Sequence, residues 1–176
     1  MHGIIHAEIK KFVEKKFPEG TWQTLLNEAG LTDKIYQPNS SYPDAEAVAI
    51  VSAASKLTGI PADAILEDFG EFLVPDLVSM YRWLIKPEWK TIEMLMHTEE
   101  SIHRVIRLKD PNLSPPQLRF EQISPNQLQL HYNSPRKMIS VAKGIIKGVA
   151  KNFNQKVEMS EKKNKDDSIV LTIKVT

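Results

Sequence analysis

Apolar residues recur at helical spacing through most of the first 108 residues, and in later segments they alternate every second residue. Side chains three and four positions apart share one face of a helix. This spacing predicts helices over 2–16, 19–29, 45–57, 62–73 and 91–108. Gly30 and Gly59 are expected to end the second and third helices, because glycine adopts the left-handed conformation that often terminates a helix. Pro75 is expected to break the fourth, since proline has no N–H to donate.

A proline-rich segment at 109–117 separates this helical part from a part with strand character. Leu128, Leu130 and Tyr132 alternate with polar residues, which is typical of a half-buried strand. Strands are predicted over 117–124, 126–133, 155–160 and 168–175, with a helix over 136–153. Helices followed by strand–strand–helix–strand–strand predict an α+β fold with an antiparallel four-stranded sheet.

The composition excludes several classes of function. The 176 residues carry 23 Lys and Arg against 22 Asp and Glu, and this balance argues against a general nucleic-acid binder. The absence of cysteine excludes disulfides, iron–sulfur clusters and a cysteine nucleophile. No apolar run approaches the roughly 18 residues of a membrane span, and the N-terminus lacks a signal-peptide pattern. We therefore expect a soluble, cytoplasmic protein with no nucleic-acid or membrane partner.

Motifs of the common catalytic types are missing from the sequence. It lacks GxSxG, HExxH and a glycine-rich phosphate loop, so we do not expect an enzyme. The adjacent acids Glu99-Glu100 and Asp166-Asp167 lie among polar residues and are expected to be solvated.

Histidines are the first candidates for metal ligands. His2 and His6 lie four apart on a predicted helix, where two rings can hold a metal, but a third ligand is not evident and we expect both to be solvated. His97 and His103 are six apart, which turns them about 120° from each other, so each is judged singly. His103 borders the apolar stripe beside Ile102. A hydrogen-bonded core residue and a metal ligand are both compatible with this position.

A second candidate site lies at the end of the second predicted strand. Tyr132, Ser134 and Arg136 occupy alternate positions, so an extended chain would project all three to one side. A phenol, a hydroxyl and a forked guanidinium suit the binding of carboxylates. The alternative is a strand end with an exposed arginine and a tyrosine that packs in the core.

These features together resemble the H-NOX (haem nitric oxide/oxygen binding) family. The resemblance rests on His103 in a long helix, on Pro115-Pro116 after it, and on Tyr-x-Ser-x-Arg at 132–136, which begins 29 residues beyond the histidine. The opening MHGII and the order of helices and strands agree with the family over essentially all 176 residues.

The resemblance implies a single domain over 1–176, with a distal helical lobe at 1–62, a proximal lobe at 63–176 and haem b (iron protoporphyrin IX) between the lobes. His103 would be the proximal ligand of the ferrous iron. The Tyr-x-Ser-x-Arg side chains would hold the propionates, and Pro116 would press on the porphyrin. The residues expected to contact the haem are Ile5, Leu73, Leu77, Ile102, Pro116, Tyr132, Ser134, Arg136, Val141 and Ile145.

The resemblance also implies which gas the haem binds. Family members that bind dioxygen stably place a distal tyrosine nine residues after the first residue of the Tyr-x-Ser-x-Arg motif, and this chain has Val141 there. Without that donor, bound dioxygen lacks a hydrogen bond worth about 1–3 kcal/mol in a dry pocket. We therefore expect a sensor that binds NO, and CO as a probe, and that discriminates against dioxygen.

Signalling is expected to begin at His103. In the family, NO weakens or breaks the iron–histidine bond, and the lobes then shift relative to each other. The output passes to a separate protein, typically a histidine kinase or a diguanylate cyclase, and we expect the kinase here. Two alternatives stay open on the sequence: a dioxygen or redox sensor on the same fold, and a haem-free protein-interaction domain.

Gly144 and Gly148 lie one turn apart in the predicted helix over 136–153, where glycine lowers helix propensity. We expect the haem or a covering helix to approach this face closely. Gly148→Val should then weaken haem retention.

Overall fold

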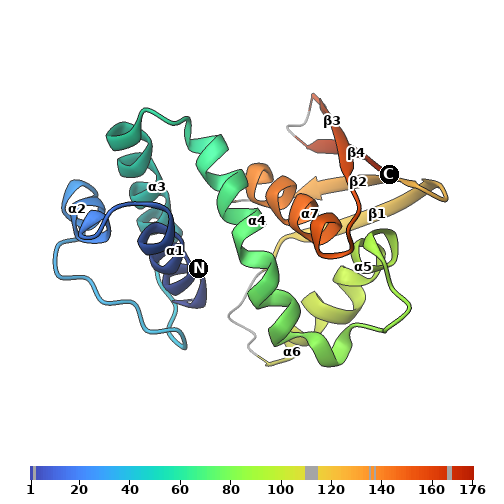
Figure 1. Cartoon of the computed structure of the whole chain (residues 1–176), viewed down its shortest axis with the longest axis horizontal. Coiled ribbons are helices and arrows are strands. Elements are labelled where there is room, and N and C mark those ends of the chain that lie inside the picture. Colours follow the sequence, from blue (N-terminus) through green and yellow to red (C-terminus); the bar gives the residue numbers. More distant parts are fainter. Residues whose placement is uncertain (2, 110–114, 135, 137, 166–167) are drawn as a thin grey trace. The chain divides into compact units, whose positions relative to one another are not determined.

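The computed structural model describes residues 1, 3–109, 115–134, 136, 138–165 and 168–176. Over these residues the chain forms two compact units, Met1–Phe69 and Gly70–Thr176 (Figure 1). Within the described part of the chain, no single helix is long and apolar enough to cross a membrane. The helices α3 (Asp44–Thr58) and α4 (Ala62–Met80) meet the length and hydropathy requirement only together, as a sharply bent pair.

The first unit is built from helices. They are α1 (Gly3–Lys16), α2 (Thr21–Glu28), α3 and the beginning of α4. Gly30 and Gly59 have φ values of 69° and 72°, which confirms the glycines expected after α2 and α3. The apolar faces of these helices meet around buried residues such as Phe12, Leu25 and Ile50.

The second unit combines helices with an antiparallel sheet. The described strands are β1 (Gln117–Ser124), β2 (Gln127–Asn133), β3 (Val157–Lys163) and β4 (Ile169–Val175), in the spatial order β1-β2-β4-β3, and α7 (Ile139–Asn152) connects β2 to β3. The two central strands are fully buried on one face, where Leu130 lies opposite Leu171 and Leu128 opposite Ile173. Ile146 of α7 belongs to the same apolar cluster. This arrangement confirms the α+β fold class expected from the sequence (Figure 1).

The helix α4 continues through Pro75, so the expected break at this residue is wrong. Proline cannot donate to the carbonyl of Glu71, but its fixed φ is compatible with helical geometry. The neighbouring Val74 is buried, and Gly148 of α7 packs against this turn: a Cβ on Gly148 would lie 2.5 Å from Val74 Cγ2 and 3.0 Å from Glu71 O. Burial of this turn against α7 therefore outweighs the loss of one helical hydrogen bond. A short 3-10 turn, η1 (Arg82–Leu84), follows α4.

The predicted helix over 91–108 contains a wider turn. The helix α5 (Thr91–His97) leads into a π-helical segment, η2 (Thr98–His103), and α6 (Arg104–Lys109) follows without a break. A π turn holds an extra residue compared with an α turn, and such turns are frequent at functional sites. His103 is the last residue of this segment.

Candidate functional site

His103 is held by a carboxylate from its own helical segment. Its Nδ1 donates to Oε2 of Glu99 over 3.0 Å, and its side chain is only 14% exposed. Burial lowers the pKa of the imidazole below its ordinary value, against the opposing effects of the Glu99 carboxylate and of a hydrogen bond with the backbone of Pro116. The lowered pKa favours the neutral imidazole, which is the form that ligates a metal.

Glu99 is the residue that sequence reasoning missed. It was expected to be solvated, but its carboxylate bonds to His103, to the guanidinium of Arg107 and to the backbone N–H of Leu118. The expectation is wrong for Glu99 because the helical turn directs it inward, whereas the adjacent Glu100 is exposed. Its spacing of four residues before His103 was the available signal. The other predicted pair, at 166–167, lies outside the described residues.

The structure brings the Tyr-x-Ser-x-Arg residues together, but through a turn and not through an extended chain. The strand β2 ends at Asn133, and the backbone N–H of Arg136 donates to Oγ of Ser134 over 3.3 Å, a local bond typical of turns. The buried Tyr132 hydrogen bonds to the Ser134 side chain and the Met138 backbone. Burial raises the pKa of the Tyr132 phenol, and the nearby charge of Arg136 partly opposes this.

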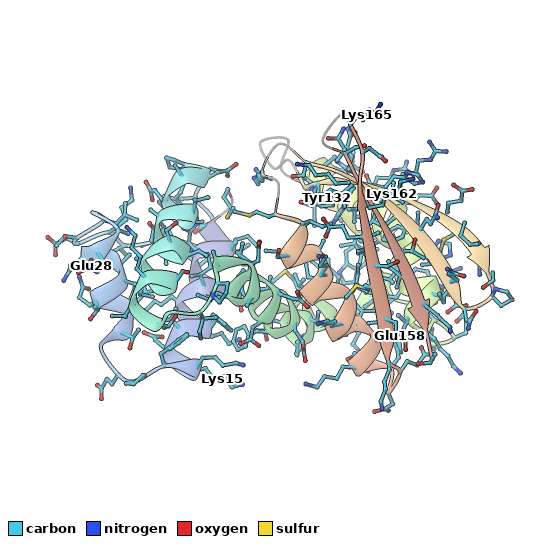
Figure 2. The ribbon with its side chains drawn as sticks, turned by 90° about the horizontal axis from the view of Figure 1, so that it is seen from above. Lys15, Glu28, Tyr132, Glu158, Lys162 and Lys165 are labelled. Atoms are coloured by element: carbon cyan, nitrogen blue, oxygen red, sulfur yellow. The ribbon has the colours of Figure 1, made fainter. Side chains whose placement is uncertain are left out.

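Tyr132 lies at the end of the sheet where β3 ends and β4 begins (Figure 2). It pairs with Ile169 across β2 and β4, and Ile169 pairs with Lys163 across β4 and β3. Its side chain belongs to the same apolar cluster as Ile102 and Ile145. The cluster therefore joins residues from η2, β2 and α7, three elements that are far apart in the sequence.

The remaining apolar candidates differ in burial. Leu73 is buried, and Leu77 and Val141 are half-buried, all within the second unit. Ile5 is half-buried on α1 of the first unit, and its expected contact with haem stays a prediction. Among the described residues, no three His, Asp or Glu side chains gather as a metal site.

Two other histidines have aromatic surroundings. His6 was expected to be solvated, but it is fully buried, stacked on Tyr36 with ring centroids 4.3 Å apart and in edge contact with Tyr42. The expectation is wrong because the loop after α2 folds back over α1, where the Gly3 backbone N–H donates to Ser40 O over 2.7 Å. The expected partner at position 2 lies outside the described residues.

His97 stacks on Trp89 with ring centroids 4.7 Å apart. His97, like His6, therefore packs its ring against an aromatic side chain.

The helices α4 and α7 cross at a contact between glycines. A Cβ on Gly70 would lie 2.3 Å from Val141 O and 3.0 Å from Gly144 Cα, closer than side chains tolerate. Together with the contact of Gly148 on Val74, this explains why α7 carries two glycines one turn apart. Of the two reasons expected for them, a covering helix is the one that the contacts support.

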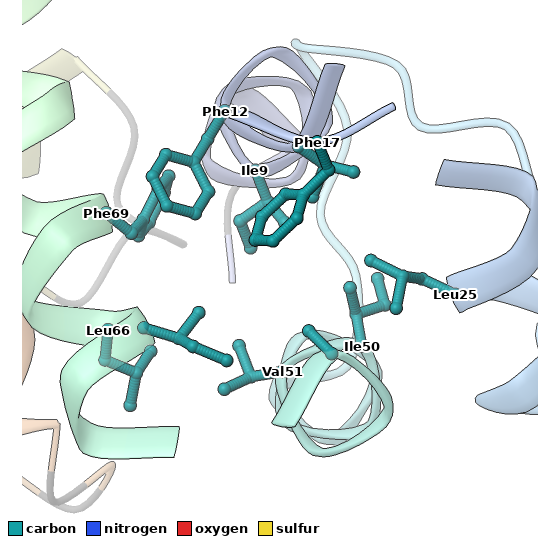
Figure 3. Close-up of a pocket in the computed structure, with 11 residues that line it drawn as sticks. Ile9, Phe12, Phe17, Leu25, Ile50, Val51, Leu66 and Phe69 are labelled. Carbon is teal, nitrogen blue, oxygen red and sulfur yellow. The ribbon is translucent and has the colours of Figure 1, made fainter. Parts of the chain in front are cut away.

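The first unit contains a small apolar cavity of about 20 Å³ (Figure 3). It is lined by side chains that include Ile9, Phe12, Phe17, Leu25, Ile50 and Phe69. Its volume is of the order needed for one water molecule, so it cannot hold a porphyrin.

The chain matches one protein family over most of its length. The family described as haem-NO-binding matches residues 2–161. The chain belongs to this family, known as H-NOX. H-NOX domains bind haem and are gas-sensing domains rather than catalytic ones.

Solved H-NOX structures share the fold over the whole chain. An H-NOX protein of Shewanella oneidensis in the Fe(II)NO state is 25% identical, with a TM-score of 0.91 and coverage of 100% of this chain and 99% of that chain. An unliganded Fe(II) H-NOX mutant from K. algicida is 26% identical, with a TM-score of 0.91 and coverage of 100% and 97%.

Soluble guanylate cyclases of Caenorhabditis elegans contain a region similar to this H-NOX domain. The cyclase gcy-31 is 25% identical over 88% of this chain and 22% of its own length, and gcy-34 is 28% identical over 86% and 23%. The chain therefore spans less than a quarter of the length of these relatives.

Proposed function

We propose that this H-NOX domain senses nitric oxide, with His103 as the proximal ligand of a ferrous haem and release of His103 as the signal. The observation that carries the proposal is a largely buried imidazole at the end of the π-helical segment, whose Nδ1 is bonded to the carboxylate of Glu99. Haem, when bound, supplies the ferrous iron to which nitric oxide and carbon monoxide coordinate. The fold of the Fe(II)NO structure from Shewanella oneidensis supports the same interpretation.

The surrounding residues fit this cofactor chemically. Tyr132 and Ser134 are joined by a side-chain hydrogen bond, the backbone N–H of Arg136 bonds to Ser134 Oγ, and the charge of Arg136 acts on the Tyr132 phenol. A phenol, a hydroxyl and a guanidinium are the donors that propionate carboxylates need. Pro116 lies next to His103 through its backbone hydrogen bond, and Ile102 adds buried apolar surface beside the histidine. We infer that these residues hold the haem edge and exclude water from the proximal side.

The test of this proposal is the absorption spectrum of the reduced protein, alone and then with nitric oxide, carbon monoxide and air. We expect a haem spectrum that shifts with nitric oxide and with carbon monoxide, and that air converts to ferric haem without a stable dioxygen complex. A colourless purified protein that takes up no added haem would refute the proposal. A stable dioxygen complex in air would refute its gas selectivity.

Selectivity against dioxygen is assigned to the apolar side chains Leu73, Leu77, Val141 and Ile145. Val141→Tyr is expected to introduce a hydrogen-bond donor and to raise dioxygen affinity about 10-fold, since a buried hydrogen bond contributes roughly 1–3 kcal/mol. Gas titration of the ferrous protein measures the change. Val141→Phe adds the same ring without the hydroxyl and should leave dioxygen affinity as it is. Equal effects of the two variants would mean that pocket shape, and not a donor, sets selectivity.

We further infer that the output passes to a separate protein, with a histidine kinase preferred to a diguanylate cyclase, and that the chain acts as one domain with lobes at 1–62 and 63–176. The family resemblance supports both inferences. Autophosphorylation of a candidate kinase, measured with the unliganded and the nitric-oxide-bound domain, tests the first. If neither the unliganded nor the nitric-oxide-bound domain changed the autophosphorylation rate of the kinase, that kinase would be excluded as the effector.

A further inference from the structure

The carboxylate of Glu99 joins three elements of the second unit. Its Oε2 accepts a hydrogen bond from Nδ1 of His103 at 3.0 Å and another from the backbone N–H of Leu118 in β1 at 3.2 Å. Its Oε1 accepts from the guanidinium of Arg107 in α6. Because Glu99 itself lies in η2, one side chain links the π-helical segment to the following helix and to the first strand.

These bonds hold the carboxylate in one position. A backbone amide in a strand cannot rotate away, and the Glu99 side chain is only 28% exposed. An exposed ion pair on a helix surface imposes little constraint, because both side chains move and solvent competes for their charges. Glu99 differs, since its oxygens are fixed by partners from separate elements. The imidazole of His103 therefore meets an acceptor with a defined direction.

A fixed anionic acceptor has a known effect on a histidine that binds a metal. A ligand histidine usually donates its second ring N–H to a carboxylate, a carbonyl or water, which fixes the tautomer and the ring orientation and raises the basicity of the ligating nitrogen. A proton on Nδ1 leaves the Nε2 lone pair for the metal. A carboxylate does this more strongly than a neutral acceptor, because its hydrogen bonds are charge-assisted.

We propose that Glu99 is the positioning residue of the proximal histidine: it orients the His103 imidazole, strengthens the bond from His103 to the haem iron, and so sets how readily nitric oxide releases that histidine. The inference rests on the function proposed above. It adds a residue outside the expected haem contacts. It also implies that the strength of the iron–histidine bond depends on the hydrogen bond from the Leu118 N–H in β1 to Glu99 in η2.

The experiment compares Glu99→Gln with Glu100→Gln in the haem-loaded protein. The glutamine side chain keeps the size and an acceptor oxygen but removes the charge, whereas Glu100 is the exposed neighbour on the same segment and serves as the matched control. Resonance Raman spectroscopy of the unliganded ferrous protein measures the iron–histidine stretching frequency. Stopped-flow absorption measures the rate at which nitric oxide displaces the histidine.

We expect Glu99→Gln to lower the stretching frequency and to speed histidine release about 10-fold, the lower end of the effect usual for an outer partner of a metal ligand. Glu100→Gln should match the unmodified protein in both measurements. Glu99→Asp, which retains the charge on a shorter side chain, should recover part of the frequency. An unchanged frequency in Glu99→Gln, or an equal shift in Glu100→Gln, would overturn the proposal.

The same data separate this proposal from the proposed function. If the unmodified protein binds haem and releases its histidine with nitric oxide while Glu99→Gln behaves identically, only the role of Glu99 is refuted. If the unmodified protein binds no haem, the proposed function itself is refuted. Thermal unfolding of the haem-free variants reports the structural role of the Leu118 and Arg107 bonds separately. Should Glu99→Gln not fold, the frequency of Glu99→Asp decides, and a value equal to that of the unmodified protein would count against the proposal.

Discussion

Replacing His103 by glycine is expected to remove the iron ligand and to cost more haem affinity than the roughly 10–100-fold loss caused by removing an outer partner of a metal ligand. The reason is that His103 is a largely buried imidazole whose Nδ1 is bonded to a carboxylate, and that the described residues contain no group of three or more His, Asp or Glu side chains that could hold the metal in its place. The ratio of haem to protein absorbance after purification measures retention. Added imidazole should restore the ferrous spectrum, because it fills the space and supplies the same nitrogen.

A matched histidine control is available on the outer face of the sheet. His131 pairs with Arg119 and Val170 in neighbouring strands, and its side chain is 40% exposed. His131→Ala should retain haem and respond to nitric oxide like the unmodified protein. If His103→Gly also kept its haem and showed an unchanged ferrous spectrum without imidazole, another residue would be the ligand and the proposals on His103 and Glu99 would both be wrong.

Replacing Gly148 by valine is expected to destabilise the fold by about 1–3 kcal/mol and to weaken haem retention. A single Cβ at this position would already lie 2.5 Å from Val74 Cγ2 and 3.0 Å from the carbonyl oxygen of Glu71. The side chain of Val74 is buried and the carbonyl is backbone, so α7 must move away from α4. Such a movement displaces Ile145 and Val141 on the same helix, which are expected haem contacts. Chemical denaturation of the haem-free protein gives the free energy of unfolding.

A compensating substitution tests the steric cause. Gly148→Ala is expected to destabilise less than Gly148→Val, and combining it with Val74→Ala removes the closest atom. The double variant should therefore lose less stability than the sum of the two single changes, a coupling expected of residues in contact. Additive losses would show that helix propensity or the Glu71 contact, and not the Val74 methyl, limits the size of residue 148.

Local patterns predicted most of the secondary structure. Alternating Leu128, Leu130 and Tyr132 placed β2 correctly, because a strand with one buried face must repeat every two residues. The glycines after α2 and α3 were placed for an equally local reason, since positive φ favours glycine. The histidine and the Tyr-x-Ser-x-Arg motif were singled out because their spacing along the chain matches a family. The family comparison confirms the family, and the roles of these residues at the haem stay predictions.

Features that depend on contacts between distant segments were not predictable in this way. Pro75 is a helix breaker by its own chemistry, yet α4 passes through it because α7, more than sixty residues later, packs against that turn. The sequence predicts that Glu99 is solvated, because its neighbours are polar. In the fold, the Leu118 N–H of β1 and the Arg107 guanidinium of α6 donate to its carboxylate, which also bonds to His103. Periodicity reports which face of an element is apolar, and a hydrogen bond between elements depends on where the rest of the chain folds. The residues expected to touch haem were named from motifs along the chain that match a family, and their contacts stay predictions, whereas the hydrogen bonds of Glu99 to His103, Arg107 and Leu118 became visible only in the folded second unit.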